Sequence, residues 1–131
     1  MARRPASRPP RVVVVANNPQ TIDVLDAYFK QVGVASNGTR ELDPTSMVPA
    51  AATALVLFPD DFGHADIERA ILRLRRARPK LLIVLVTGAP QHLAAALEPD
   101  GRSVPPLVLP RPAFGWTILD AIRARSKLSP A

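Results

Sequence analysis

The chain has 131 residues, of which 47% are hydrophobic and 21% are charged, and this usage is typical of one soluble globular domain. No apolar stretch approaches the roughly 20 residues of a membrane-spanning helix, and the basic N-terminus lacks the longer apolar region of a signal peptide. The absence of cysteine excludes disulfides and thiolate metal sites and agrees with a cytoplasmic location, so we expect a cytoplasmic protein without membrane insertion.

The net charge of +6 is concentrated in two segments. Residues 1–10 combine arginines with prolines and contain little that could be buried, so we predict a flexible basic arm. A second basic cluster lies on a predicted helix and just after it, and consists of Arg69, Arg73, Arg75, Arg76, Arg78 and Lys80. Because such charges more often form a solvated face than a phosphate-binding surface, nucleic-acid binding is our alternative function. Its candidate residues are Arg3, Arg4, Arg8, Arg73 and Arg76.

In chain order, the first predicted element is a strand over 12–16, whose β-branched run is typical of burial on both faces. Apolar residues at helical spacing predict a helix over 21–32, which Gly33 ends. Residues 34–36 are expected to form a short strand, followed by a turn at Asn37-Gly38. Two prolines permit at most a turn or two of helix between 41 and 52.

The second half of the sequence continues the alternation of strand and helix. Apolar runs predict strands, and amphipathic segments predict helices, in the order strand 54–58, helix 65–77, strand 81–86, short helix 91–97, strand 107–109 and helix 116–125. Prolines on both sides of 107–109 favour an edge position for that strand. Such alternation predicts an α/β fold, a doubly wound parallel sheet with helices on both faces.

The strand ends resemble those of the receiver domain of bacterial response regulators. Residues 107–114, Leu-Val-Leu-Pro-Arg-Pro-Ala-Phe, are similar to the family's fifth strand, with Arg111 in place of its lysine and Pro112 matching its proline. Thr87 lies where the family has a Ser or Thr that bonds the phosphoryl group. The resemblance covers 11–127, leaves 128–131 as a tail, and implies a flavodoxin-like five-stranded sheet in the order 2-1-3-4-5. It also implies a cis Arg111–Pro112 bond.

The acidic residues of the family's phosphorylation site are missing from this sequence. Receivers hold Mg²⁺ with two acids after the first strand, where Ala16 and Asn17 stand here, and the phosphorylated aspartate is replaced by Pro59. The aromatic switch residue of the fifth strand falls at Val108. Phosphoryl transfer depends on Mg²⁺ and on carboxylates that hold it, so we expect a degenerate pocket with no metal, no cofactor and no enzymatic activity. A shift of one residue would instead offer Asp60 as the acceptor.

These departures imply a pseudoreceiver, which is a phosphorylation-independent protein-interaction module in two-component signal transduction. Receivers contact protein partners, and often a second copy of themselves, through the fourth helix, fifth strand and fifth helix. The resemblance therefore implies a partner surface and is compatible with a homodimer; the residues expected on this surface are Val108, Pro110, Trp116 and Ile122.

Three other functional hypotheses have weaker support in the sequence. Acid–base catalysis by Asp60 and Asp61 would need a pocket and a shifted pKa, whereas two acids before a helix are ordinarily stabilised by its dipole. His64 and His92 have no cysteine or suitably spaced carboxylate, so we interpret them as surface histidines rather than metal ligands. Flavin binding or another enzymatic role rests on shared topology alone.

Overall fold

The computed structural model describes residues 10–42 and 48–128. The predicted basic arm lies outside the described residues except for Pro10, and so do Arg3, Arg4, Arg8 and most of the predicted tail. Within the described residues, no helix combines the length and the apolar character needed to cross a bilayer.

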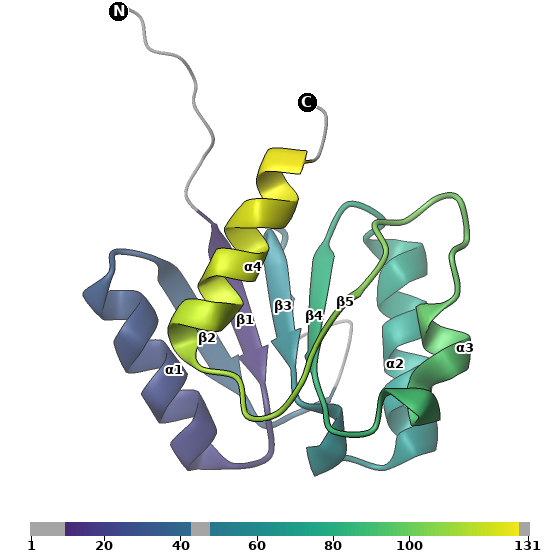
Figure 1. The fold of residues 1–131 in the computed structure, drawn as a ribbon, viewed down its shortest axis with the longest axis horizontal. Helices are drawn as coiled ribbons and strands as arrows, with labels where there is room; N and C mark the ends of the chain where they lie inside the picture. The colour runs from purple at the N-terminus through teal and green to yellow at the C-terminus, as the bar shows by residue number, and fades with distance from the viewer. Residues whose placement is uncertain (1–9, 43–47, 129–131) are drawn as a thin grey trace, which may run out of the picture.

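Five strands form one parallel sheet in the order β2-β1-β3-β4-β5, as the resemblance implied (Figure 1). The strands are β1 (Arg11–Val15), β2 (Ala35–Thr39), β3 (Ala54–Leu57), β4 (Leu82–Val86) and β5 (Leu107–Leu109). Every residue of β3 and β4 is buried, which explains why their sequences are continuous apolar runs rather than alternating ones. β5 lies at an edge of the sheet, as its flanking prolines predicted.

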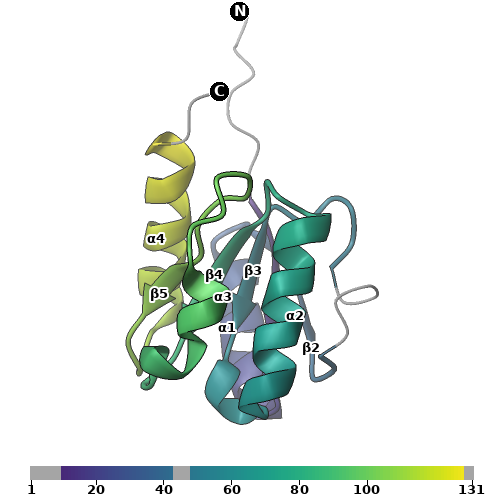
Figure 2. The same ribbon diagram turned by 90° about the vertical axis from the view of Figure 1, so that its right-hand side faces the viewer.

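Helices cover both faces of the sheet (Figures 1 and 2). α1 (Pro19–Gln31) and α4 (Gly115–Leu128) pack on the face that receives Val12 and Val14. α2 (His64–Ala77) and the short α3 (Ala94–Leu97) pack on the opposite face, which receives Val13 and Val15. Two 3₁₀ turns, η1 (Pro59–Asp61) and η2 (Pro90–Leu93), follow β3 and β4. Because successive side chains of a strand point to opposite faces, the strands contribute to two separate hydrophobic cores.

The second strand is longer than predicted, and the expected turn at Asn37-Gly38 is wrong. Both residues belong to β2, where Asn37 pairs with Val13 and Gly38 with Val14. A Cβ atom at position 38 would collide with the side chain of Ile22 on α1. Gly38 is therefore present because α1 approaches the strand closely, and not because the chain reverses direction there.

The connection from β2 to β3 contains no helix in its described residues, 40–42 and 48–53. Its carbonyl groups instead accept hydrogen bonds from one side chain that follows α2. The Arg78 guanidinium donates at 3.0–3.3 Å to the backbone oxygens of Val48, Pro49, Ala50 and Ala52. This arginine takes over part of the role that a helical hydrogen-bond ladder would have.

Arg75 makes a similar set of bonds on the other side of α2. Its side chain is buried and donates to the carbonyls of Ala96 at 2.9 Å and Glu98 at 2.7 Å and to Ser103 Oγ at 2.8 Å. Asp100 lies 3.5 Å from the same guanidinium. Arg75 thus holds α3 and the loop after it against α2. Within the predicted basic cluster, Arg75 and Arg78 therefore have structural roles.

Replacing Arg75 by alanine should destabilise the protein strongly. Arg75→Ala leaves the buried carbonyl of Ala96, the carbonyl of Glu98 and a serine hydroxyl without their donor, and the expected loss is about 2–4 kcal/mol of unfolding free energy. The neighbouring Arg76 is exposed, so Arg76→Ala is the matched control and should change stability by less than about 0.5 kcal/mol. Denaturant titration of both variants checks this; equal losses would contradict the role assigned to Arg75.

Candidate functional site

The candidate site lies where the strands end, at the lower edge of the sheet in Figure 1. Parallel strands bring their carboxyl ends to one edge, where α/β proteins of this topology bind ligands. The loops after β1, β3, β4 and β5 meet there and supply the polar side chains of the site. Those side chains are Asn17, Asp60, Asp61, Thr87 and Arg111, joined by Arg40 from the segment after β2.

Asp60 is the centre of the hydrogen-bond network in this site. Its Oδ1 accepts from the Thr87 hydroxyl at 2.6 Å, and its Oδ2 accepts from the backbone N–H of Gly88 at 3.0 Å. Nη1 of Arg111 lies 3.3 Å from the same Oδ2 and forms an ion pair with it. One carboxylate thereby joins the ends of β3, β4 and β5, and both of its oxygens already have donors.

The network sets the protonation state of Asp60. Burial alone would raise the pKa of this carboxyl, but the hydrogen bonds from Gly88, Thr87 and Arg111 and the positive charge of Arg111 outweigh burial. The net effect is a pKa below the ordinary value of 3.8, so the group is ionised at neutral pH. A carboxylate of this kind is a poor general acid, because it holds no proton to give at neutral pH.

The first-strand half of the site is built around Asn17. Its backbone N–H donates to Oδ2 of Asp61 at 2.9 Å, and its side-chain oxygen accepts from the Arg40 guanidinium at 3.3 Å. Ala16, the residue before it, is fully buried and offers only a methyl group. A guanidinium therefore lies beside the position where receivers hold a cation, according to the resemblance.

The residues present do not fit the Mg²⁺ that the receiver fold implies. Mg²⁺ requires several oxygen ligands, usually with at least one or two carboxylates, in octahedral arrangement. No group of three or more His, Cys, Asp or Glu side chains in residues 10–42 and 48–128 is placed to hold a metal ion. Asp60 and Asp61 are instead bonded to Thr87, Gly88, Arg111 and Asn17, and Arg40 adds a competing positive charge.

The structure locates the other residues of the predicted pocket as follows. Pro59 is buried as the first residue of η1, immediately after β3. The carboxylate that meets Thr87 and Arg111 belongs to the next residue, Asp60, which is the one-residue alternative recognised in the sequence. Pro112 follows a cis peptide bond from Arg111, as the resemblance implied.

The predicted partner surface needs correction. Ile122 is only 2% exposed and belongs to the core beneath α4, so its side chain does not reach a partner. Val108 is partly buried and packs against the core on the α2 side of the sheet. Pro110 and Trp116 are exposed. The helical spacing that singled out Ile122 marks the inner side of α4, because that side packs on the sheet.

An exposed aromatic surface lies instead between α1 and the start of α4. The Phe114 and Trp116 rings are stacked with centroids 4.8 Å apart, and Tyr28 meets Trp116 edge to face. More than half of the Phe114 and Trp116 side chains is open to solvent, and so is Val24 across the cleft. The cleft holds about 500 Å³. Sequence reasoning missed Phe114, although an aromatic residue between Pro112 and Gly115 in a loop has no helical neighbours to bury it.

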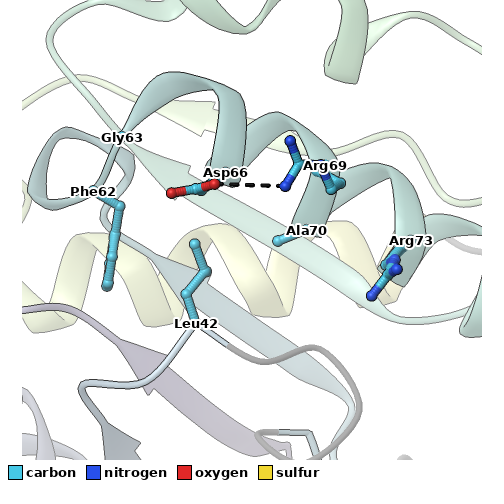
Figure 3. A pocket seen from close by; sticks show the side chains of 7 residues that line it. All are labelled: Leu42, Phe62, Gly63, Asp66, Arg69, Ala70 and Arg73. Carbon is cyan, nitrogen blue, oxygen red and sulfur yellow. Dashed lines mark ion pairs between the residues drawn. The ribbon is translucent and has the colours of Figure 1, made fainter.

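A second, smaller hollow lies between α2 and the segment after β2 (Figure 3). Leu42 and Phe62 line one side of it, and Arg69 and Arg73 project from α2 on the other. Arg69 lies 3.6 Å from Asp66, one turn earlier on the same helix. Of the proposed nucleic-acid residues that the structure describes, Arg73 lines this hollow and Arg76 is exposed near the end of α2.

Neutralising Asp60 should lower stability in a pH-dependent way. In Asp60→Asn the charge that Arg111 and Gly88 stabilise is gone, so the variant should unfold more easily than the wild type at neutral pH. Because the folded pKa is lowered, the wild-type advantage is present above the ordinary value of 3.8 and is lost as the pH falls through the folded pKa. Denaturant titrations at neutral and strongly acidic pH measure this difference.

The control for Asp60→Asn is Asp66→Asn, which removes an exposed carboxylate beside Arg69 and should have little effect. A difference between wild type and Asp60→Asn that stays constant over the acid range would contradict the assigned network.

Comparison with known proteins adds evidence on the fold. No family model and no curated protein matches the sequence. Among solved structures, the signal receiver domain of an HD domain-containing protein from Pseudomonas fluorescens matches with a TM-score of 0.73 and 17% identity, over 92% of this chain and 97% of that one. A CheY-like receiver domain protein from Methanospirillum hungatei gives 0.67 and 14%, over 92% and 96%. The BeF₃-activated receiver domain of DrrB from Thermotoga maritima gives 0.66 and 13%, over 92% and 99%. The chain therefore has the receiver fold.

Proposed function

We propose that this chain is a pseudoreceiver that acts in bacterial signal transduction by binding a protein partner, without being phosphorylated. The proposal depends chiefly on one observation, the occupation of the candidate site by the protein's own groups. Asp60 is bonded to Thr87, Gly88 and Arg111, and Asn17 stands beside Arg40. The receiver fold supports a role in signalling, since the similar structures are receiver domains.

The charge balance of the site explains why phosphorylation is not expected. Asp60 is paired with the Arg111 guanidinium, and the Arg40 guanidinium lies on Asn17, which is bonded to Asp61. The two positive charges offset those of the two carboxylates, so little negative charge remains to attract a divalent cation. Without that cation, the charge that develops on a transferring phosphoryl group and its leaving oxygen lacks its usual counter-charge. A phosphodonor would also have to displace Arg111 and Thr87 from Asp60.

The proposed partner surface is the aromatic surface formed by Tyr28, Phe114 and Trp116, together with Val24. Large aromatic side chains at the centre of an apolar cleft are typical anchors of protein interfaces. Exposed aromatic groups of this size lose hydrophobic stabilisation unless another molecule covers them. This surface adjoins the candidate site, because Arg111 and Pro112 line the same cleft.

The contacts of α2 argue against the part of the nucleic-acid alternative that involves this helix, while Arg3, Arg4 and Arg8 lie outside the described residues. Arg75 and Arg78 are bonded to backbone carbonyls of their own chain, and Arg69 is paired with Asp66. The exposed side of α2 therefore carries Asp66 and Glu68 beside Arg73 and Arg76, which is a mixed surface rather than a basic one. Phosphate backbones require concentrated positive charge.

Phosphorylation independence is tested by incubating the purified protein with Mg²⁺ and acetyl phosphate, and separately with beryllofluoride. We expect no phosphoryl mass increase in intact-protein mass spectrometry and no bound-fluoride signal in ¹⁹F NMR. A receiver domain with its full set of acids is the positive control. Modification of the wild type that disappears in Asp60→Asn would identify Asp60 as an acceptor and overturn this part of the proposal.

The partner surface is tested with Phe114→Ser and Trp116→Ser in affinity purification from the native host. Both side chains are more than half exposed, so the variants should fold normally and lose the bound partner. Leu72→Ser removes an exposed apolar side chain from α2, on the opposite face of the sheet, and should retain the partner. Quantitative mass spectrometry of the captured proteins, followed by titration of the purified partner, gives the result. Equal capture by all three variants would exclude this surface.

A further inference from the structure

Two histidines that are distant in sequence lie against each other in the structure. His64 is the first residue of α2, and His92 lies in η2 after β4. Nε2 of His64 and Nδ1 of His92 are 3.1 Å apart. Both side chains are exposed, so solvent reaches the pair. Both histidines therefore lie on the surface, as the sequence predicted, and the fold brings them together there.

The relative position of the rings favours a shared ligand. A straight N–H···N bond between two imidazoles would hold their ring centroids about 5.4 Å apart, whereas two imidazoles at neighbouring positions of one metal ion would hold them about 4.8 Å apart. The observed centroids are 4.3 Å apart and the ring planes are tilted by 48°. The rings therefore lie side by side, closer to the second arrangement than to the first.

The separation of the nitrogens also suits a metal ion. Zinc binds imidazole nitrogen at about 2.0–2.1 Å, so two such ligands stand about 2.9 Å apart at a right angle and about 3.4 Å apart in a tetrahedron. The 3.1 Å between His64 Nε2 and His92 Nδ1 falls between these limits.

We propose that His64 and His92 form a two-imidazole site for a divalent transition-metal ion of the zinc, nickel and copper class. Imidazole is a preferred ligand of these ions. The sequence contains two histidines and no cysteine, and both imidazoles lie at this one place. No third His, Cys, Asp or Glu of the described residues joins them, and water completes the coordination.

For two neutral imidazoles, binding requires a change of tautomer in one ring. In the free protein one of the two facing nitrogens carries a hydrogen and the other accepts it. A metal ion needs the lone pairs of both, so the shared hydrogen leaves and the outer nitrogen of the same ring takes one up. Nδ1 of His64 and Nε2 of His92 then carry the hydrogens.

Such a site would connect the two loops that hold Asp60. His64 follows η1, which contains Asp60, and His92 lies in η2, a few residues after Thr87 and Gly88. A bound ion would fix the β3–α2 connection to the β4–α3 connection. The inference does not depend on the proposed partner surface, which lies on the α1 and α4 side of the sheet.

The site is tested with zinc chloride and the full-length, tag-free protein. Isothermal titration should show one zinc ion per chain, and the Tm should rise with zinc concentration because the ion binds the folded state. Long-range ¹H–¹⁵N NMR of the imidazoles should show both rings protonated on their outer nitrogens when zinc is present. His64→Gln and His92→Gln should each lose binding, because one imidazole alone is a weak ligand.

A matched control keeps the number of histidines and moves one of them. The double variant Gln91→His with His92→Gln still has two imidazoles, but one of them has moved to a neighbouring position on the turn. This variant should also lose zinc binding and the Tm increase, while far-UV circular dichroism confirms its fold. Absence of zinc binding in the wild type, or full binding in any of the three variants, would overturn the proposal.

Discussion

All five strands of this protein end at one edge of the sheet, and a single carboxylate holds three of those ends together. The two oxygens of Asp60 accept from a side chain, a backbone N–H and a guanidinium that come from the ends of β4 and β5. Residues separated by 27 to 51 positions in sequence are joined through one group, so its geometry positions the rest of the site. The bond to Thr87 is partly buried, which makes it stronger than it would be in water.

In the function that we propose, this edge keeps the scaffold of a receiver pocket without the chemistry of phosphoryl transfer. The Arg111 guanidinium pairs with Asp60, and the Arg40 guanidinium donates to the side-chain oxygen of Asn17. In that proposal, a pocket whose Asp60 is paired within the chain would present a constant shape to another protein. The neighbouring cleft, lined by Tyr28, Phe114 and Trp116, offers such a shape.

Much of the fold could be predicted because its signals are local. The apolar runs of β1, β3 and β4 are buried on both faces, and the prolines around β5 forbid a central position. The candidate site was predictable only in part. Thr87 and Arg111 follow recognisable strands, whereas the choice between Pro59 and Asp60 depends on how η1 turns after β3.

The burial of particular arginines and the contact between the two histidines depend on tertiary packing and could not be predicted from local sequence. Arg75 and Arg78 share the sequence character of the exposed Arg76, and only the packing of α2 decides which arginines become buried donors. The meeting of His64 with His92 likewise depends on the spacing of two loops across the sheet edge. For Ile122 the sequence did carry the signal. Its spacing from the other apolar residues of α4 predicts a buried side chain, so it should not have been placed on a contact surface.

The fastening of the β2–β3 connection by Arg78 has an evolutionary consequence. Its four acceptors are peptide oxygens, which every amino acid possesses, so the bonds persist whatever side chains occupy residues 48–52. Substitutions in this segment are therefore tolerated as long as its backbone path is kept. Selection acts instead on Arg78, whose side chain makes the bonds. Relatives of this chain should diverge rapidly at the connection and keep a guanidinium at the end of α2.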